Sequence, residues 1–183
     1  MALDGRRAQI AGAVIEILAA GGARALTHSA VDTHLGIPAG SSSYYFRTRR
    51  TLVRAAADEL INRSRERFEQ LTADMPHAPR PEHAAATITA YVQALCAHRQ
   101  DDLRARLALM PEIDDEFREV LARAFFSHHA AVELCRTLGH RDPGAAAAGL
   151  ISLLEGVTLR STFGASPKSA DLEAHILRLL SSP

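Results

Sequence analysis

Residues 26–49 read LTHSAVDTHLGIPAGSSSYYFRTR, and this stretch decides the fold. Thr27 offers a side-chain hydroxyl as the N-cap of a short helix, which the pattern predicts over residues 28–35. Gly36 follows directly, and glycine tolerates the left-handed backbone at the C-terminal end of a helix. The first half of the stretch therefore predicts one short, capped helix.

The second half predicts another short helix, over residues 39–45, closed by Phe46. Pro38 has no backbone N–H to donate, so it fits only the start of that helix. Two short helices joined by a three-residue turn with a glycine form a helix-turn-helix, which places its second helix in the major groove of DNA. A Gly-Ser-Ser-Ser run taken alone is also typical of a flexible loop, so the prediction depends on the order of the whole stretch.

The predicted second helix carries side chains suited to nucleic acid. Its small residues let the backbone approach base edges, and serine hydroxyls both donate and accept hydrogen bonds. Tyr44 and Tyr45 offer phenolic hydroxyls to phosphates and flat rings to sugars or thymine methyl groups. Arg47, Arg49 and Arg50 lie near the start of the next helix, where cations and backbone amides together bind phosphate.

Helical periodicity extends over most of the chain. An amphipathic helix runs through Ile10, Val14, Ile17 and Leu18 and is predicted to end at Gly21-Gly22, and Thr48 is a plausible N-cap for the helix over 49–73. A proline-rich stretch over 74–81 predicts a linker. Further helices are predicted over 82–98, 101–110, 114–138, 143–163 and 169–181. The fold class expected is all-α.

Composition and charge set the broad class. The chain has 183 residues, 47% of them hydrophobic, and no run approaches the roughly 20 apolar residues that span a membrane, so a soluble, cytoplasmic protein is expected. Net charge is zero, yet residues 1–54 carry +4 and the remainder −4, an imbalance that predicts a basic module joined to an acidic body but also arises by chance. Cys96 and Cys135 are expected to be buried free thiols.

The sequence resembles the tetracycline-repressor-like (TetR) regulators over residues 10–60. The similarity covers the first helix and the helix-turn-helix signature, in order and spacing. The matching residues are Ile10, Ala13, Ile17, Leu18, Gly21, Gly22, Leu26, Thr27, Val31, Leu35, Gly36, Ile37, Gly40, Ser41, Tyr45, Phe46, Thr48, Arg49 and Leu52. The resemblance implies a three-helix DNA-binding domain over residues 1–52 and a helical effector-binding and dimerisation domain over 53–183.

The resemblance also implies which residues contact DNA. Gly40 would let the backbone approach, and the others would contact bases or phosphates. The full set is Thr27, His28, Gly40, Ser41, Ser43, Tyr44, Tyr45, Arg47 and Arg49. This sequence departs from the family pattern at Ser42, where an inward-packing aliphatic residue is usual, so the recognition helix is expected to be less firmly docked and its operator cannot be borrowed from relatives.

The larger domain of the family binds a ligand and forms a dimer. Pocket candidates here are aromatic, polar or adaptable apolar side chains on the middle helices: Tyr91, Leu95, Leu107, Met110, Phe125, Phe126, His129 and Glu155. Dimer candidates lie on apolar stripes of the last two helices: Leu150, Leu153, Leu154, Val157, Leu172, Ile176 and Leu179. Those stripes could instead face the core of their own chain.

Together these features predict a homodimeric transcriptional regulator, most simply a repressor that leaves a palindromic operator when a small apolar or amphipathic effector binds. The alternative is a ligand-blind DNA-binding or adaptor protein of the same fold. No nucleophile with a base, phosphate-binding glycine loop or metal-ligand spacing is present, so neither an enzyme nor a cofactor or metal site is expected. His98 with His128 and His129 has no ligand spacing, and Asp114, Asp115 and Glu116 suit the solvated start of a helix.

Overall fold

The computed structural model describes residues 2–73, 79–112, 121, 125–165 and 168–181, and every regular element in these ranges is helical. None of these helices is long and apolar enough to span a membrane. The elements are α1 (Ala2–Ala25), α2 (His28–Leu35), α3 (Ser41–Tyr45), α4 (Arg49–Thr72), α5 (Pro81–His98), α6 (Gln100–Leu109), the 3₁₀ turn η1 (Met110–Glu112), α8 (His128–Thr137), α9 (Pro143–Thr162) and α10 (Ser169–Ser181).

The chain packs as two compact units. Unit 1 comprises Met1–Arg63 with Asp101–Phe125, and unit 2 comprises Ser64–Gln100 with Phe126–Pro183. This division by packing falls inside α4, between Arg63 and Ser64, and the functional boundary after residue 52 that the resemblance implies stays a prediction. The segment Asp101–Phe125 also returns to unit 1, a long-range association that no local pattern of residues encodes.

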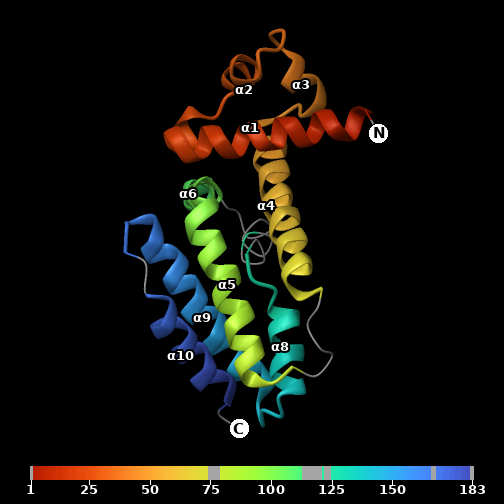
Figure 1. Cartoon of the computed structure of the whole chain (residues 1–183). Helices are drawn as coiled ribbons and strands as arrows, with labels where there is room; N and C mark the ends of the chain where they lie inside the picture. Colours follow the sequence, from red (N-terminus) through yellow and green to blue (C-terminus); the bar gives the residue numbers. More distant parts are fainter. Residues whose placement is uncertain (1, 74–78, 113–120, 122–124, 166–167, 182–183) are drawn as a thin grey trace. The chain divides into compact units, whose positions relative to one another are not determined.

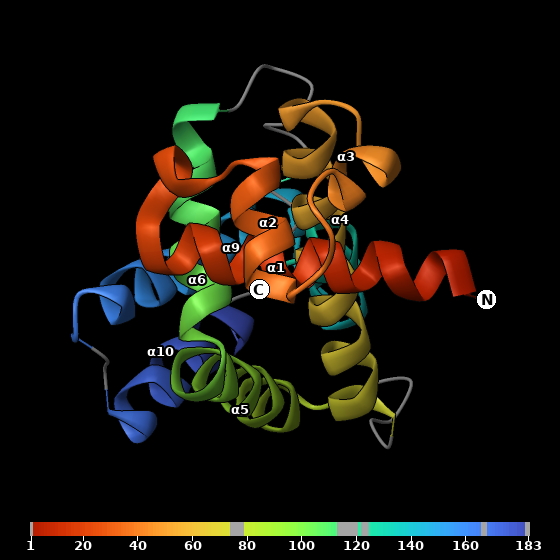
Figure 2. The ribbon, with the colours of Figure 1, turned by 90° about the horizontal axis from the view of Figure 1, so that it is seen from above.

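In unit 1, α2 lies across α1 and α3 lies beside α2 (Figures 1 and 2). Ile10, Val14 and Leu18 of α1 are fully buried, as their helical spacing predicts. The backbone leaves helical geometry at Gly22, with φ 68° and ψ −174°, but helical turns resume and α1 ends at Ala25. Gly22 thus bends this segment rather than ending it, because glycine is the residue that adopts positive φ without steric cost.

The predicted caps of α2 are confirmed. The Thr27 hydroxyl accepts a hydrogen bond from the Ala30 backbone N–H at 3.0 Å, and Gly36 takes the left-handed conformation. The prediction that the next helix starts after Pro38 is wrong, because that helix, α3, begins at Ser41. Pro38 opens a turn in which its carbonyl accepts from the Ser41 N–H and Gly40 has φ 87°, so the chain turns once more before it becomes helical.

In unit 2, α5 packs along α10 and α8 packs along α9 (Figure 1). Buried aliphatic side chains fill these contacts, and five of the seven predicted dimer residues belong to them: Leu150, Leu154, Val157, Leu172 and Ile176. These five face the core of their own chain, the alternative that the sequence left open. Leu153 is half-buried and Leu179 is exposed, so these two alone of the seven offer substantial surface to a second chain.

The predicted continuous helix over 114–138 is interrupted. Phe125, Phe126 and Ser127 are not helical, and α8 starts only at His128. The Ser127 hydroxyl accepts a hydrogen bond from the Ala130 N–H at 3.2 Å, so this serine is an N-cap. The acidic cluster at 114–116 lies outside the described residues.

Both cysteines are free thiols, as expected. Cys135 is buried and Cys96 is half-buried. Burial raises the pKa of both thiols, and a hydrogen bond with Ser161 partly offsets this for Cys96. Both groups are therefore weak nucleophiles at neutral pH.

Candidate nucleic-acid interface

A buried carboxylate holds the start of α3. Asp32 of α2 is 3% exposed, and its Oδ2 accepts the Gly40 N–H at 2.7 Å while its Oδ1 accepts the Ser42 N–H at 2.8 Å. The first backbone N–H groups of a helix have no partner within the helix, so an acceptor placed there satisfies donors that would otherwise be buried unpaired. Asp32 thus fixes the angle at which α3 leaves the turn.

The charge of Asp32 matches this role. Burial raises the pKa of the Asp32 carboxyl, but hydrogen bonds from Ser42 and Gly40, together with the nearby His28, outweigh burial and hold the pKa below its ordinary value. A carboxylate that accepts two backbone hydrogen bonds is stabilised in its charged form. Asp32 is therefore ionised at neutral pH.

Ser42 and His28 complete the contact between α2 and α3. Ser42 is fully buried, and its hydroxyl donates to the His28 carbonyl oxygen at 3.2 Å. The His28 Nε2 in turn donates to the Phe46 carbonyl oxygen, at 2.6 Å, where α3 ends. Hydrogen bonds to His28 therefore hold both ends of α3 against α2. They compensate for the aliphatic side chain that the family usually has at the position of Ser42.

The face of α3 turned away from Asp32 presents polar and aromatic groups. Tyr44 is 77% exposed, and its ring meets that of Tyr45 edge-on with centroids 5.2 Å apart. Ser41 and Ser43 are half-buried, and their hydroxyls donate to the carbonyls of Pro38 and Gly40. Each hydroxyl oxygen keeps lone pairs for an outside donor, and rotation about its bond would free the proton as well.

Two of the arginines that follow α3 differ in their surroundings. Arg47 is exposed. Arg49 is half-buried, and its guanidinium donates to the Glu112 carboxylate and, at 2.6 Å, to the Ala23 carbonyl oxygen. The structure therefore ties the predicted phosphate contact Arg49 to two acceptors within unit 1, whereas Arg47 is open to a phosphate.

The helices behind this surface are braced by a second arginine. Arg63 of α4 donates to Glu59 at 2.8 Å and to Asp102 of α6 at 3.0 Å, and Asp102 is 4% exposed. Burial lowers the pKa of Arg63, but the two carboxylates outweigh it and raise the pKa above its ordinary value. A Cβ at position 12 would lie 3.2 Å from the Arg63 guanidinium, so Gly12 lets this guanidinium pack closely against α1.

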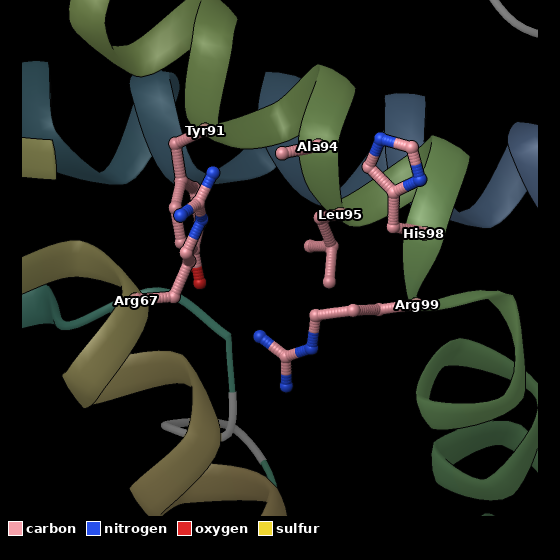
Figure 3. Close-up of a pocket in the computed structure, with 6 residues that line it drawn as sticks. All are labelled: Arg67, Tyr91, Ala94, Leu95, His98 and Arg99. Carbon is pink, nitrogen blue, oxygen red and sulfur yellow. The ribbon is translucent and has the colours of Figure 1, made fainter. Parts of the chain in front are cut away.

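Unit 2 contains a small open hollow of about 100 Å³ between α4 and α5 (Figure 3). Its lining residues are Arg67, Tyr91, Ala94, Leu95, His98 and Arg99. Tyr91 and Leu95 are the two predicted pocket residues that line it. Phe126 lies next to the hollow, with its ring 6.0 Å from that of Tyr91.

The other predicted pocket residues do not line this hollow. In unit 1, Leu107 and Met110 are exposed and Phe125 is buried beneath the Arg106 guanidinium, 5.1 Å from its ring centroid. In unit 2, His129 is exposed on α8 and Glu155 is half-buried on α9.

Sequence reasoning missed several functional candidates. The sequence pattern does not single out Asp32, and it indicates His98 only as a histidine without metal-ligand spacing. Arg67 and Arg99 went unnoticed, although Arg99 adjoins the break between two predicted helices, a place where side chains commonly turn inward to a helix end. Among the described residues, no group of three His, Cys, Asp or Glu side chains is placed to hold a metal ion.

Comparison with known proteins rests on structure. No protein-family model and no curated relative matches the sequence significantly. A candidate transcriptional regulator from Streptomyces coelicolor A3(2) aligns with TM-score 0.72 and 24% identity, covering 97% of this chain and 99% of its own. A TetR-family member from Streptomyces coelicolor A3 aligns with TM-score 0.73 and 21% identity, covering 95% and 97%. The fold is that of TetR-family regulators.

A third solved structure shares this fold. The multidrug-binding protein EbrR, complexed with imidazole, aligns with TM-score 0.70 and 22% identity, covering 98% of this chain and 92% of its own. All three alignments extend over both units of the chain, so the resemblance first seen in residues 10–60 continues through the part of the sequence that carries no motif.

Proposed function

We propose that this chain is a DNA-binding transcriptional regulator of the TetR type. The observation that carries the proposal is the α2–α3 pair, in which a buried carboxylate fixes α3 while Tyr44, Ser41 and Ser43 remain accessible on its outer side. A helix that enters the major groove must be rigid on its inner side and polar on its outer side. Here Ser42 lies on the inner side of α3, bound to Asp32, and Ser41, Ser43 and Tyr44 lie on its outer side.

The roles of individual side chains follow from their exposure. Tyr44, Ser41 and Ser43 read base edges or adjoining phosphates, and Arg47 binds phosphate. Thr27 and His28 use their polar atoms to cap α2 and to hold Phe46, so their contact with DNA would come through phosphates passing the start of α2. Arg49 reaches a phosphate only by leaving Glu112.

The test is selection of bound duplexes from a random DNA library by the purified full-length protein, followed by fluorescence-anisotropy titration of the selected sequence. We expect one sequence family to be enriched. Arg47→Ala should weaken binding to all sequences and lower the salt slope of log K by about one. Arg141→Ala, at an exposed arginine of unit 2, is the matched control and should bind as wild type. Failure to enrich any sequence would refute the proposal.

We also propose that DNA binding responds to a small molecule in unit 2. The hollow between α4 and α5 and the imidazole complex of the structural neighbour EbrR support this. A ligand changes DNA affinity only by its differential affinity for the two conformations, so an effector that prefers the unbound form relieves repression. The check is anisotropy of the protein–operator complex during effector titration, and an unchanged DNA affinity at saturating effector contradicts it.

A homodimer is the proposed assembly, formed through the outer face of α9 rather than its buried stripe. That face carries two exposed large apolar side chains, Leu159 (45%) and Phe163 (77%), next to small residues that permit close approach of a second helix. The small exposed residues are Ala145, Ala148, Gly149, Ser152 and Gly156. Two recognition helices related by a two-fold axis would read a palindrome.

Sedimentation equilibrium tests the assembly. The double variant Leu159→Glu, Phe163→Glu should be a monomer at concentrations at which wild type is a dimer, because unpaired charges would be buried at the interface. The matched control is Ala86→Glu, at an exposed position on α5. A double variant that still sediments as a dimer would exclude this face.

A further inference from the structure

An arginine of α1 lies at the end of α3. The guanidinium carbon of Arg7 lies over the ring of Phe46, 5.5 Å from the ring centroid, and Phe46 is the residue at which α3 ends. The contact connects the first turns of α1 with α3, which lies beside the N-terminal half of α1 (Figures 1 and 2). The DNA contacts assigned so far all come from residues 27–49, so Arg7 belongs to an element that they do not include.

The positive charge of Arg7 is open to solvent. Arg7 is exposed, whereas the Phe46 beneath it is only 9% exposed. A cation over an aromatic ring is attracted by the electrons of the ring face, which restricts the position of the guanidinium but leaves its N–H donors for acceptors. In the part of the chain that the structure describes, no carboxylate forms an ion pair with Arg7. Arg7 is therefore a positioned cation with donors available to an anion.

Arg47 places a second exposed cation at the same end of α3. It follows Phe46 directly in the chain, so one arginine covers the Phe46 ring and the other continues its backbone. The Phe46 carbonyl oxygen accepts a hydrogen bond from His28 of α2 at 2.6 Å. The segment between the two cations is thus fixed to both α1 and α2, and the two charges are held in one place relative to α3.

We propose that Arg7 and Arg47 together bind DNA phosphates at the end of α3, so that α1 takes part in the DNA interface. Phosphate strands form the walls of the major groove, and a helix in that groove brings the residues beyond its ends toward those walls. Two cations at one end of α3 would fix the position of the helix along the groove without reading bases. This inference rests on the proposed function. The competing explanation is that Arg7 only covers the Phe46 ring and stabilises unit 1.

Anisotropy titrations across a salt series test the proposal with the full-length protein, on the selected operator and on a scrambled duplex. A phosphate contact displaces counterions from either sequence, so Arg7→Gln should lower the salt slope of log K by about one on both duplexes. Arg7→Lys keeps the charge and should keep the slope, although lysine lacks the planar group that packs on the ring. The double variant Arg7→Gln, Arg47→Ala should lower the slope by about two.

Arg6→Gln is the matched control on the same turn of α1. Arg6 is half-buried and donates to the Gln9 side-chain oxygen at 3.0 Å, so its removal should leave the slope near the wild-type value. Circular dichroism melting verifies that each variant folds. An unchanged slope in Arg7→Gln would overturn the proposal, because a residue that only covers Phe46 displaces no counterions. Equal reductions in Arg6→Gln and Arg7→Gln would also overturn it, because they indicate a diffuse positive potential.

Neutral methylphosphonate groups at single positions of the operator locate the contact. Neutralising the phosphate held by Arg7 should weaken binding of the wild type and leave binding of Arg7→Gln unchanged, and the absence of any such position contradicts the proposal. The two levels of failure are distinguishable. If the proposed function is wrong, the wild type itself enriches no DNA sequence and this inference is lost with it. If this inference alone is wrong, the wild type binds its operator and Arg7→Gln binds with the same salt slope.

Discussion

The α2–α3 pair in unit 1 and the α9–α10 region in unit 2 are held together by different chemistry. The contact between α2 and α3 depends on one carboxylate, Asp32, and on the hydroxyl of Ser42. The inner faces of α9 and α10 are aliphatic and almost fully buried, as Leu150 and Ile176 show. Hydrogen bonds impose direction, whereas apolar burial is non-directional and adds up over area.

The two regions therefore meet two different requirements, the fixed orientation of a binding helix and the overall stability of the fold. A helix that must present side chains in a fixed orientation is held by geometry-dependent bonds, and a helix that supplies bulk stability is held by area. Substitutions in the α2–α3 contact should therefore change DNA binding more than stability. Substitutions in the buried faces of α9 and α10 should lower stability and leave DNA binding by the folded protein unchanged.

The largest expected effect comes from Ile176→Ala in α10. Ile176 is fully buried, so the variant leaves a cavity and should lose about 2–5 kcal/mol of unfolding free energy. Urea unfolding followed by circular dichroism measures this loss. DNA affinity per folded molecule should stay at the wild-type value, and the exposed Ala174→Gly on the same helix should cost only about 1 kcal/mol. A fall in affinity of the folded variant would break the comparison.

Asp32→Asn in α2 should lose less stability, about 1–3 kcal/mol, because one amide oxygen replaces two charged acceptors. Its DNA affinity should fall by more than this stability loss explains, since α3 is no longer fixed. Anisotropy titration at a temperature at which the variant is fully folded measures the affinity. The control is Asp58→Asn in α4, whose carboxylate forms an exposed pair with Arg54. Wild-type affinity in Asp32→Asn would mean that α3 is positioned by something else.

The same carboxylate predicts a pH dependence. The pKa of Asp32 is lower in the folded protein than the ordinary value of 3.8, so its stabilising charge is fully present above that pH. As pH falls below 3.8 and through the lowered folded value, this contribution is lost. The difference in unfolding free energy between wild type and Asp32→Asn should be constant near neutrality and shrink in acid. A difference independent of pH from 7 down to about 3 would contradict the assigned charge.

The smallest expected effect comes from Glu112→Gln in η1. Removing the carboxylate weakens the hold on Arg49 and frees its guanidinium for a phosphate, so DNA affinity should rise a few-fold and the salt slope should steepen. Both quantities come from anisotropy titrations across a salt series. Arg49→Ala in the Glu112→Gln background should abolish the gain. If the DNA affinity of Glu112→Gln does not rise, the Arg49–Glu112 ion pair only stabilises unit 1 and does not restrain DNA binding.

The sequence predicted α2 and its caps because capping chemistry is local. Thr27 and Gly36 act on atoms within a few residues, and their side chains or backbone preferences determine the outcome. The same reasoning misplaced the start of α3, because Gly40 adds a left-handed residue to the turn and Asp32, from the preceding helix, supplies the acceptor at the start of α3. That contact connects two elements and has no signature in either one alone.

The candidate sites were predicted less well in unit 2. An apolar stripe indicates that one face of a helix is buried but not which molecule buries it, so Leu150 and Ile176 could be assigned equally to the core or to a partner. The non-helical segment at residues 125–127 was not predicted, because Phe125 and Phe126 continue the apolar pattern, although Ser127 carries a cap signal. Arg67 and Arg99 meet at the hollow only through packing of α4 against α5.

The clamp formed by Asp32 has an evolutionary consequence. It accepts hydrogen bonds from the peptide N–H groups of residues 40 and 42, and neither bond involves the outward side chains of Ser41, Ser43 and Tyr44. Under the proposed function, exchanges at these three positions would leave the Asp32 hydrogen bonds in place and change the DNA sequence that α3 recognises, with the loss of the turn contacts that Ser41 and Ser43 donate. Under the proposed function, the DNA preference can therefore change through single substitutions on the outer side of α3 while Asp32 keeps the start of that helix in place.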